Sequence, residues 1–155
     1  MRRIGCLFVL FVLMLSTAGC TAYEGPYTFW RQDRSHIEKV EICSYNSFDK
    51  TQTVITTLSD TAEALLDEIS SLECLEYFPG DHPREYGPFV VCITYSDGEM
   101  ELIGFTNIGY IKPDGVRCLT EYFIADSQEF FDVICKYVES DLVQDMNEEY
   151  SDWFY

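Results

Sequence analysis

The stretch FVVCITYSDGEMELIGFT, residues 89–106, decides the fold of this chain. Its β-branched and aromatic residues lie on both sides of Asp97-Gly98, and such residues favour strands. Aspartate followed by glycine is typical of a hairpin turn, because both central residues of a type I′ turn need a positive φ. We therefore expect two antiparallel strands, 89–96 and 99–106, joined at Asp97-Gly98.

The segments on either side of this hairpin extend the expected sheet. Towards the C-terminus, the turn sequence Lys112-Pro113-Asp114-Gly115 separates strands at 108–111 and 116–124, which makes an antiparallel meander. Towards the N-terminus, strand patterns at 36–45 and 51–58 flank a turn at 46–50 and predict a second hairpin. The alternating residues 74–78 indicate a further short strand.

Two segments have the apolar spacing of amphipathic helices. The first follows Asp60, which forms a capping-box pattern with Glu63, and the second follows Asp126, which does the same with Glu129. We expect an α+β fold, in which an antiparallel β-sheet made of a hairpin plus a meander carries the two helices packed on one face.

The first 20 residues have the layout of a secretory signal. Met1-Arg2-Arg3 is positively charged, residues 4–15 are apolar, and residues 16–19 are small. The apolar run is about 12 residues long, whereas a helix that spans a membrane needs roughly 20. Ala18-Gly19-Cys20 resembles the lipobox of bacterial lipoproteins, although Thr17 stands where leucine is usual. The resemblance implies cleavage before Cys20, attachment of lipid such as palmitate to Cys20, and anchoring at the extracytoplasmic face of the cell membrane.

This pattern divides the chain into four parts. We expect a signal peptide at 1–19, the lipidated cysteine and a tether at 20–35, a single α+β domain at 36–141, and an acidic, aromatic C-terminal tail at 142–155. The aromatic residues of the tether could lie in either of two places, at the lipid interface or folded onto the surface of the domain. The tail either extends the second helix or is loose.

The charge of the chain is strongly acidic. The formal net charge is −17, and removal of Arg2 and Arg3 with the signal would leave −19. Such a surface repels nucleic acid and anionic lipid, so we expect no nucleic-acid partner. It would attract a basic protein or peptide.

The cysteines of the mature chain are odd in number, so they cannot all pair with one another. They are Cys43, Cys74, Cys92, Cys118 and Cys135. They are either small buried hydrophobic residues or members of one or two disulfides in an oxidising compartment. A reactive thiol has little support, since only Cys118 and Cys135 have a basic neighbour in the sequence.

The longest irregular segment of the domain is PGDHPREYGP, residues 79–88, and loops carry function more often than scaffolds do. Its polar residues form the candidate binding loop: Asp81, His82, Arg84 and Glu85. The chain has no nucleophile elbow, H-E-x-x-H motif, phosphate-binding glycine loop, EF-hand loop or paired zinc ligands. We therefore predict no catalytic residue, no metal site and no cofactor.

The layout from Ile37 to Val138 resembles small lipoproteins of unknown function from gut-type Gram-positive bacteria (Firmicutes). The resemblance is carried by residues 54–60 leading into a helix, by the hairpin around residues 93–99, and by the closing helix with Phe130. It implies a fold and a location but no activity. Our first hypothesis is a non-catalytic, membrane-anchored binding domain. An enzyme or thiol-active protein that uses the 79–88 loop or a free cysteine is the alternative, and an inhibitor or immunity-type protein is a third, by fold analogy alone.

Overall fold

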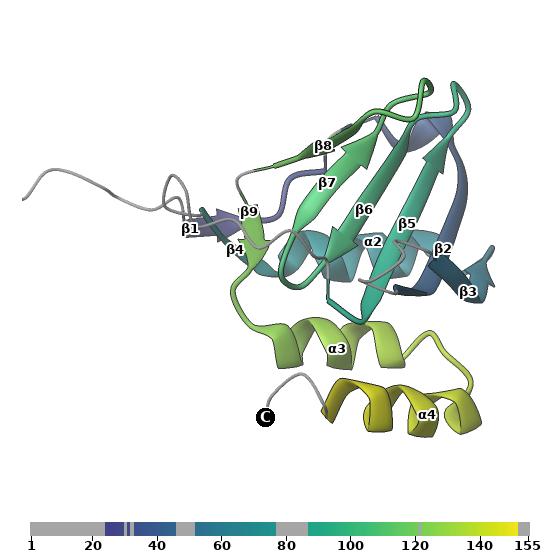
Figure 1. Cartoon of the computed structure of the whole chain (residues 1–155), viewed down its shortest axis with the longest axis vertical. Helices are drawn as coiled ribbons and strands as arrows, with labels where there is room; N and C mark the ends of the chain where they lie inside the picture. The colour runs from purple at the N-terminus through teal and green to yellow at the C-terminus, as the bar shows by residue number, and fades with distance from the viewer. Residues whose placement is uncertain are drawn as a thin grey trace, which may run out of the picture.

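The computed structural model describes residues 24–29, 31, 33–45, 52–76, 87–120 and 122–151. The predicted signal peptide and Cys20 lie outside these residues, as do the polar residues of the predicted binding loop. The described part of the chain is an α+β fold built on antiparallel sheets, which confirms the predicted class (Figure 1). Within it, no helix is long and apolar enough to cross a membrane.

The larger sheet has six antiparallel strands in the order β3-β2-β5-β6-β7-β8. Both predicted hairpins are present, and β2 joins them by pairing with β5, with Val40 opposite Ile93. The strands are β2 Ile37–Tyr45, β3 Gln52–Leu58, β5 Phe89–Tyr95, β6 Met100–Gly104, β7 Ile108–Ile111 and β8 Arg117–Leu119.

The turn of the central hairpin lies one residue earlier than we expected. The Gly98 N–H donates to the Tyr95 carbonyl at 2.9 Å, so Ser96 and Asp97 are the central residues of the turn. Gly98 follows them with a φ of 84°. The predicted type I′ turn at Asp97-Gly98 is therefore wrong. The loop has three residues, and glycine is needed only at its last, left-handed position.

A smaller sheet lies at one side of the large one (Figure 1) and has the order β1-β4-β9. Its strands are β1 Glu24–Pro26, β4 Glu73–Glu76 and β9 Tyr122–Ile124. The single strand expected at 116–124 is thus two strands in two sheets. The chain changes sheet after Leu119, where the N–H and the hydroxyl of Thr120 both donate to the Ile108 carbonyl at 2.8 Å.

The described residues contain three α-helices, one more than expected: α2 Ala62–Ser71, α3 Ser127–Cys135 and α4 Ser140–Ser151. Asp126 caps α3 as predicted, because its carboxylate accepts from the N–H groups of Gln128 and Glu129. The predicted cap at Asp60 is wrong. The residue before α2 is Thr61, which has helical backbone angles and makes no side-chain cap.

One face of the large sheet packs with all three helices in the main core. Along β5, Phe89, Val91, Ile93 and Tyr95 point into this core. The alternate residues Val90 and Cys92 belong to a second cluster on the opposite face. The helices contribute buried residues to the main core: Leu65, Leu66, Ile69, Phe130, Phe131, Val133, Ile134 and Met146.

The packed domain extends beyond the predicted range of 36–141 at both ends. On the N-terminal side of residue 36, the side chains of Tyr27 and Phe29 are only 7% and 9% exposed. These aromatic residues of the expected tether therefore fold onto the domain. On the C-terminal side of residue 141, helix α4 continues to Ser151, and Met146 of this helix is only 2% exposed. Apolar side chains in both flanks supply the driving force, since each removes area from water by packing against the core.

Candidate functional site: an aromatic cavity with a buried glutamate

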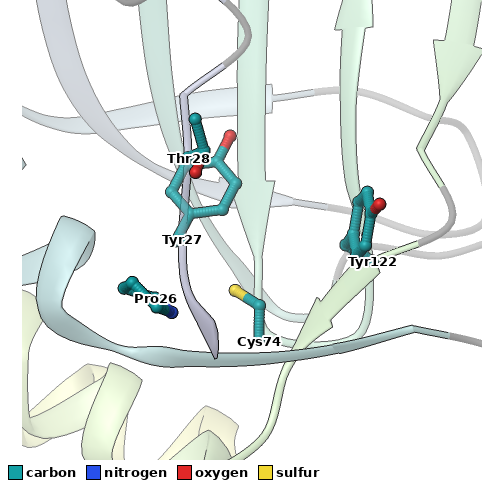
Figure 2. A pocket seen from close by; sticks show the side chains of 5 residues that line it. All are labelled: Pro26, Tyr27, Thr28, Cys74 and Tyr122. Atoms are coloured by element: carbon teal, nitrogen blue, oxygen red, sulfur yellow. The ribbon is translucent and has the colours of Figure 1, made fainter. Parts of the chain in front are cut away.

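Two adjoining cavities lie between the segment that follows β1 and the strands of both sheets. The larger has a volume of about 540 Å³ and the smaller about 230 Å³. Tyr27, Thr28 and Tyr122 line both of them. Pro26 and Cys74 complete the described lining of the smaller cavity (Figure 2). The larger cavity is also lined by Phe29, Glu101, Ile108, Gly109, Tyr110, Leu119 and Thr120.

Glu101 is the buried carboxylate of this site. It lies on β6 between Ile93 of β5 and Tyr110 of β7, and only 1% of it is exposed. The Tyr27 hydroxyl donates to one carboxylate oxygen, Oε1. The Tyr95 hydroxyl donates to the other oxygen at 2.7 Å. These bonds offset part of the cost of removing a carboxylate from water.

The two tyrosine hydroxyls remain protonated and serve as donors. Burial raises the pKa of Tyr27 well above its usual value, and the negative charge of Glu101 raises it further. Burial and Glu101 raise the pKa of Tyr95 in the same way. Each oxygen of Glu101 accepts one tyrosine hydroxyl, so both tyrosines act as donors to this side chain.

Arg31 clamps the N-terminal wall of the cavity to the central hairpin. Its guanidinium donates to Asp97 and Glu99, at 2.5 Å in each case, and its central carbon lies 4.7 Å from the centroid of the Tyr95 ring. The hydrogen bond from Arg31 lowers the pKa of Asp97.

Arg34 makes a similar clamp onto α2. Its guanidinium lies 5.2 Å from the centre of the Phe29 ring and donates to Asp67 at 2.6 Å. Two arginines therefore hold the segment that carries Tyr27 and Phe29 against the sheet and the helix.

Cys74 is the thiol of the smaller cavity. Figure 2 shows its sulfur turned towards the side on which Tyr27 and Pro26 lie, away from Tyr122. The residue is 1% exposed, and burial raises the pKa of Cys74 to about 12. A thiol with such a pKa is almost fully protonated at neutral pH, which makes it a poor nucleophile.

The structure does not place the site residues that were predicted from the sequence. Asp81, His82, Arg84, Glu85 and Cys20 all lie outside the described residues. Within the described part of the chain, no group of three or more His, Cys, Asp or Glu side chains is placed to hold a metal ion.

The five cysteines between residues 43 and 135 are free thiols. Cys43 and Cys92 are in hydrogen-bond contact in the second core cluster, and each is 1% exposed. Burial raises the pKa of Cys135 to about 11. Cys43, Cys74 and Cys92 fit the interpretation of the cysteines as small buried residues, and Cys43 and Cys92 form an adjacent pair. Cys118 and Cys135 are partly exposed and do not fit it fully.

Sequence reasoning missed Tyr27 and Glu101, although β6 holds a signal for the second. Glu101 has the same strand parity as Ile103, so it points to the apolar face of its strand. A carboxylate at an inward position is rare and worth attention. Tyr27 gives no such signal, because 74 residues separate it from Glu101.

Comparisons of the chain with protein-family models, with curated proteins and with solved structures found no match.

Proposed function

We propose that this chain is a membrane-anchored extracytoplasmic lipoprotein whose domain binds a small ligand without transforming it. The observation that carries the binding function is the larger cavity, whose volume of about 540 Å³ lies within the usual range for ligand sites. Its composition supports the same function. Apolar and aromatic walls surround a few convergent polar groups, here the Glu101 carboxylate and the Thr120 side chain.

The mouth of the cavity gives a ligand apolar surface to cover. Leu119 and Tyr122 line the larger cavity and are 44% and 36% exposed. They come from β8 and β9, at the point where the chain changes from one sheet to the other. An exposed apolar rim around a concave site favours binding, because a ligand that covers it removes apolar area from water.

Several observations favour binding over catalysis. Both oxygens of Glu101 already accept tyrosine hydrogen bonds, and the raised pKa of Cys74 leaves that thiol unreactive. Among the described lining residues there is no histidine. These features support a site that positions a ligand and does not exchange protons with it.

The anchor at Cys20 would keep this cavity close to the membrane. Tyr27 is only seven residues beyond Cys20, and seven extended residues span at most about 25 Å. A ligand would then be taken from the layer of solvent next to the lipid surface. The net charge of −19 expected for the mature chain would keep the domain from lying flat on anionic lipid.

Lipid attachment is tested by metabolic labelling with an alkyne fatty acid in a bacterial host, comparing the wild-type chain with Cys20→Ser. We expect label and membrane association for the wild type and neither for Cys20→Ser. Cys6→Ser is the matched control and should retain both. Equal labelling of the wild type and Cys20→Ser would contradict the anchor.

Ligand binding is tested with a library of small molecules, detected by amide chemical shifts. We expect some compounds to shift Thr28, Gly109 and Thr120 together, because these residues line one cavity. Thr28→Trp should fill the cavity and abolish these shifts, whereas Val54→Trp, at an exposed site on β3, should leave them unchanged. Absence of any shift at the cavity across the library would overturn the binding function.

A further inference from the structure

We propose that the ligand of the larger cavity is an organic ammonium cation, either a protonated amine or a quaternary ammonium group. This inference rests on the proposed binding function and adds the chemical class of the ligand. It is carried by the charge, the aromatic walls and the hydrogen-bond pattern of the cavity.

The charge of the described lining is negative. Glu101 is a carboxylate in the cavity wall, and no Lys, Arg or His is among the described lining residues. Opposite charges attract more strongly at a site with little water than in bulk solvent, because the effective dielectric constant is lower. The net charge of −17 for the whole chain adds long-range attraction for cations and repulsion for anions. An anionic ligand is therefore disfavoured both by Glu101 inside the cavity and by the net charge of the chain at longer range.

The walls are suited to an organic cation. Tyr27, Phe29, Tyr110 and Tyr122 contribute aromatic rings, and the face of an aromatic ring attracts ammonium groups. The same part of the molecule already uses this interaction twice, in the contacts of Arg31 with Tyr95 and of Arg34 with Phe29. An ammonium group with alkyl substituents would satisfy the apolar walls and the carboxylate together.

The hydrogen bonds of Glu101 favour an organic cation over a metal ion. A bound metal ion needs several oxygen, nitrogen or sulfur ligands in direct contact. Both oxygens of Glu101 accept from tyrosine hydroxyls, and the described residues supply no cluster of three metal-ligating side chains. An alkylammonium ion needs no such direct coordination, since charge attraction and ring contacts act over a longer range.

The test compares choline with its uncharged carbon isostere, in which a tert-butyl group replaces the trimethylammonium group. Titration calorimetry on the full chain in non-ionic detergent, together with amide shifts at the cavity, measures both affinities. We expect choline or protonated butylamine to bind at least about tenfold more tightly than the uncharged isostere. Stronger binding of butylamine would assign a primary amine, and stronger binding of choline a quaternary one.

Glu101→Gln keeps the shape of the side chain and removes its charge, so it should abolish the preference for the cation. Glu41→Gln is the matched control, because Glu41 is also a buried strand carboxylate, 8% exposed, and bonds Lys39 and Thr57 away from the cavity. It should retain the preference.

A second pair of variants does not depend on the folding of Glu101→Gln. Leu119 is an exposed residue at the rim of the cavity, so Leu119→Lys places a tethered ammonium beside the cavity. This positive charge should weaken choline binding by about tenfold. Leu119→Gln, which adds no charge, should not weaken it. If the isostere binds as tightly as choline, the ammonium proposal fails while the binding function stands. If neither these probes nor any library compound shifts the cavity, both fail.

Discussion

Glu101 receives hydrogen bonds from two tyrosines that belong to different parts of the chain. Tyr95 lies on the neighbouring strand of the central hairpin, and Tyr27 comes from the segment after β1. The single side chain of Glu101 therefore connects the N-terminal wall of the cavity to the sheet. This connection gives the carboxylate a structural role at a position where an apolar residue would pack at lower cost.

Solvent exposure separates the five thiols between residues 43 and 135 into two groups. Cys43, Cys74 and Cys92 are each 1% exposed, whereas Cys118 and Cys135 are partly exposed. We expect a small alkylating reagent to modify Cys118 in the folded protein, Cys135 more slowly because burial raises its pKa to about 11, and the other three only after unfolding. Peptide mapping by mass spectrometry measures this. Rapid native labelling of Cys74 would instead favour the thiol-active alternative.

Two glycines with positive φ should differ in their tolerance of alanine. A Cβ at Gly98, where φ is 84°, meets nothing closer than Pro113 at 3.9 Å, so Gly98→Ala costs only the left-handed backbone conformation, about 1–2 kcal/mol. A Cβ at Gly87, where φ is 87°, would lie 2.4 Å from the Phe105 ring. Gly87→Ala should therefore lower the free energy of unfolding further.

Urea denaturation measures both losses. Gly98→Asn is the control, since asparagine tolerates the left-handed region better than alanine, and it should cost less than Gly98→Ala. A loss for Gly98→Ala as large as that for Gly87→Ala would contradict the role of Phe105.

At the scale of elements, α2 is joined to the end of α3 by a polar cluster. Glu68 of α2 accepts from the Lys136 ammonium at 2.5 Å and from the Tyr137 hydroxyl at 2.6 Å. These two donors lower the pKa of Glu68, and the bond to Glu68 raises the pKa of Tyr137 to about 12. The cluster is partly exposed, so its contribution to stability is reduced by solvent screening.

The pH dependence of this cluster follows from the two shifts. The lowered pKa of Glu68 contributes stability above its usual value of 4.5, and this stability is lost as the pH falls through the lower folded value. The raised pKa of Tyr137 contributes stability below pH 10, which is lost as the pH rises towards 12. We expect Glu68→Gln to lower the free energy of unfolding by up to about 1 kcal/mol at pH 7.

Urea denaturation at several pH values tests this prediction. The difference between Glu68→Gln and the wild type should shrink on acidification below the usual glutamate pKa. Glu73→Gln, at an exposed carboxylate outside the cluster, serves as the control. A difference that does not change with pH would show that the ionisation of Glu68 is not responsible.

Some of the secondary-structure elements could be predicted from local sequence patterns and others could not. The two hairpins and the cap at Asp126 follow from residues close together in the chain, and the structure has them. The boundary between β8 and β9 does not follow from the local pattern, because all of 116–124 favours a strand. The change of sheet depends on Thr120 bonding to Ile108, a contact with a distant residue.

At the scale of the whole molecule, α4 is part of the domain and not an appendage. Met146 is 2% exposed in the main core, and Leu142 and Val143 pack against that core. The expected tail at 142–155 therefore begins inside a helix. Its many acidic residues obscured the apolar positions, which recur at 142, 143 and 146 on one side of the helix.

Met146→Ala tests the contribution of α4. We expect it to lower the free energy of unfolding by about 2–4 kcal/mol, because it removes buried methylene groups and leaves a cavity. Gln144→Ala, at an exposed position of the same helix, should change it by less than about 0.5 kcal/mol. Urea denaturation compares the two variants. A neutral Met146→Ala would contradict the docking of α4.

The sequence by itself determined most of the strand segments, the helices α2 and α3, the two hairpins, the α+β class and the acidic charge. It also carries the predicted anchor at Cys20. These properties depend on composition, on periodicity and on contacts between near neighbours in the chain. Only the tertiary structure decided that β2 pairs with β5, that the chain changes sheet at Thr120, and that Tyr27 meets Glu101. The reason is that such contacts join residues far apart in sequence, and their partners are selected by the burial and hydrogen bonding of the whole domain.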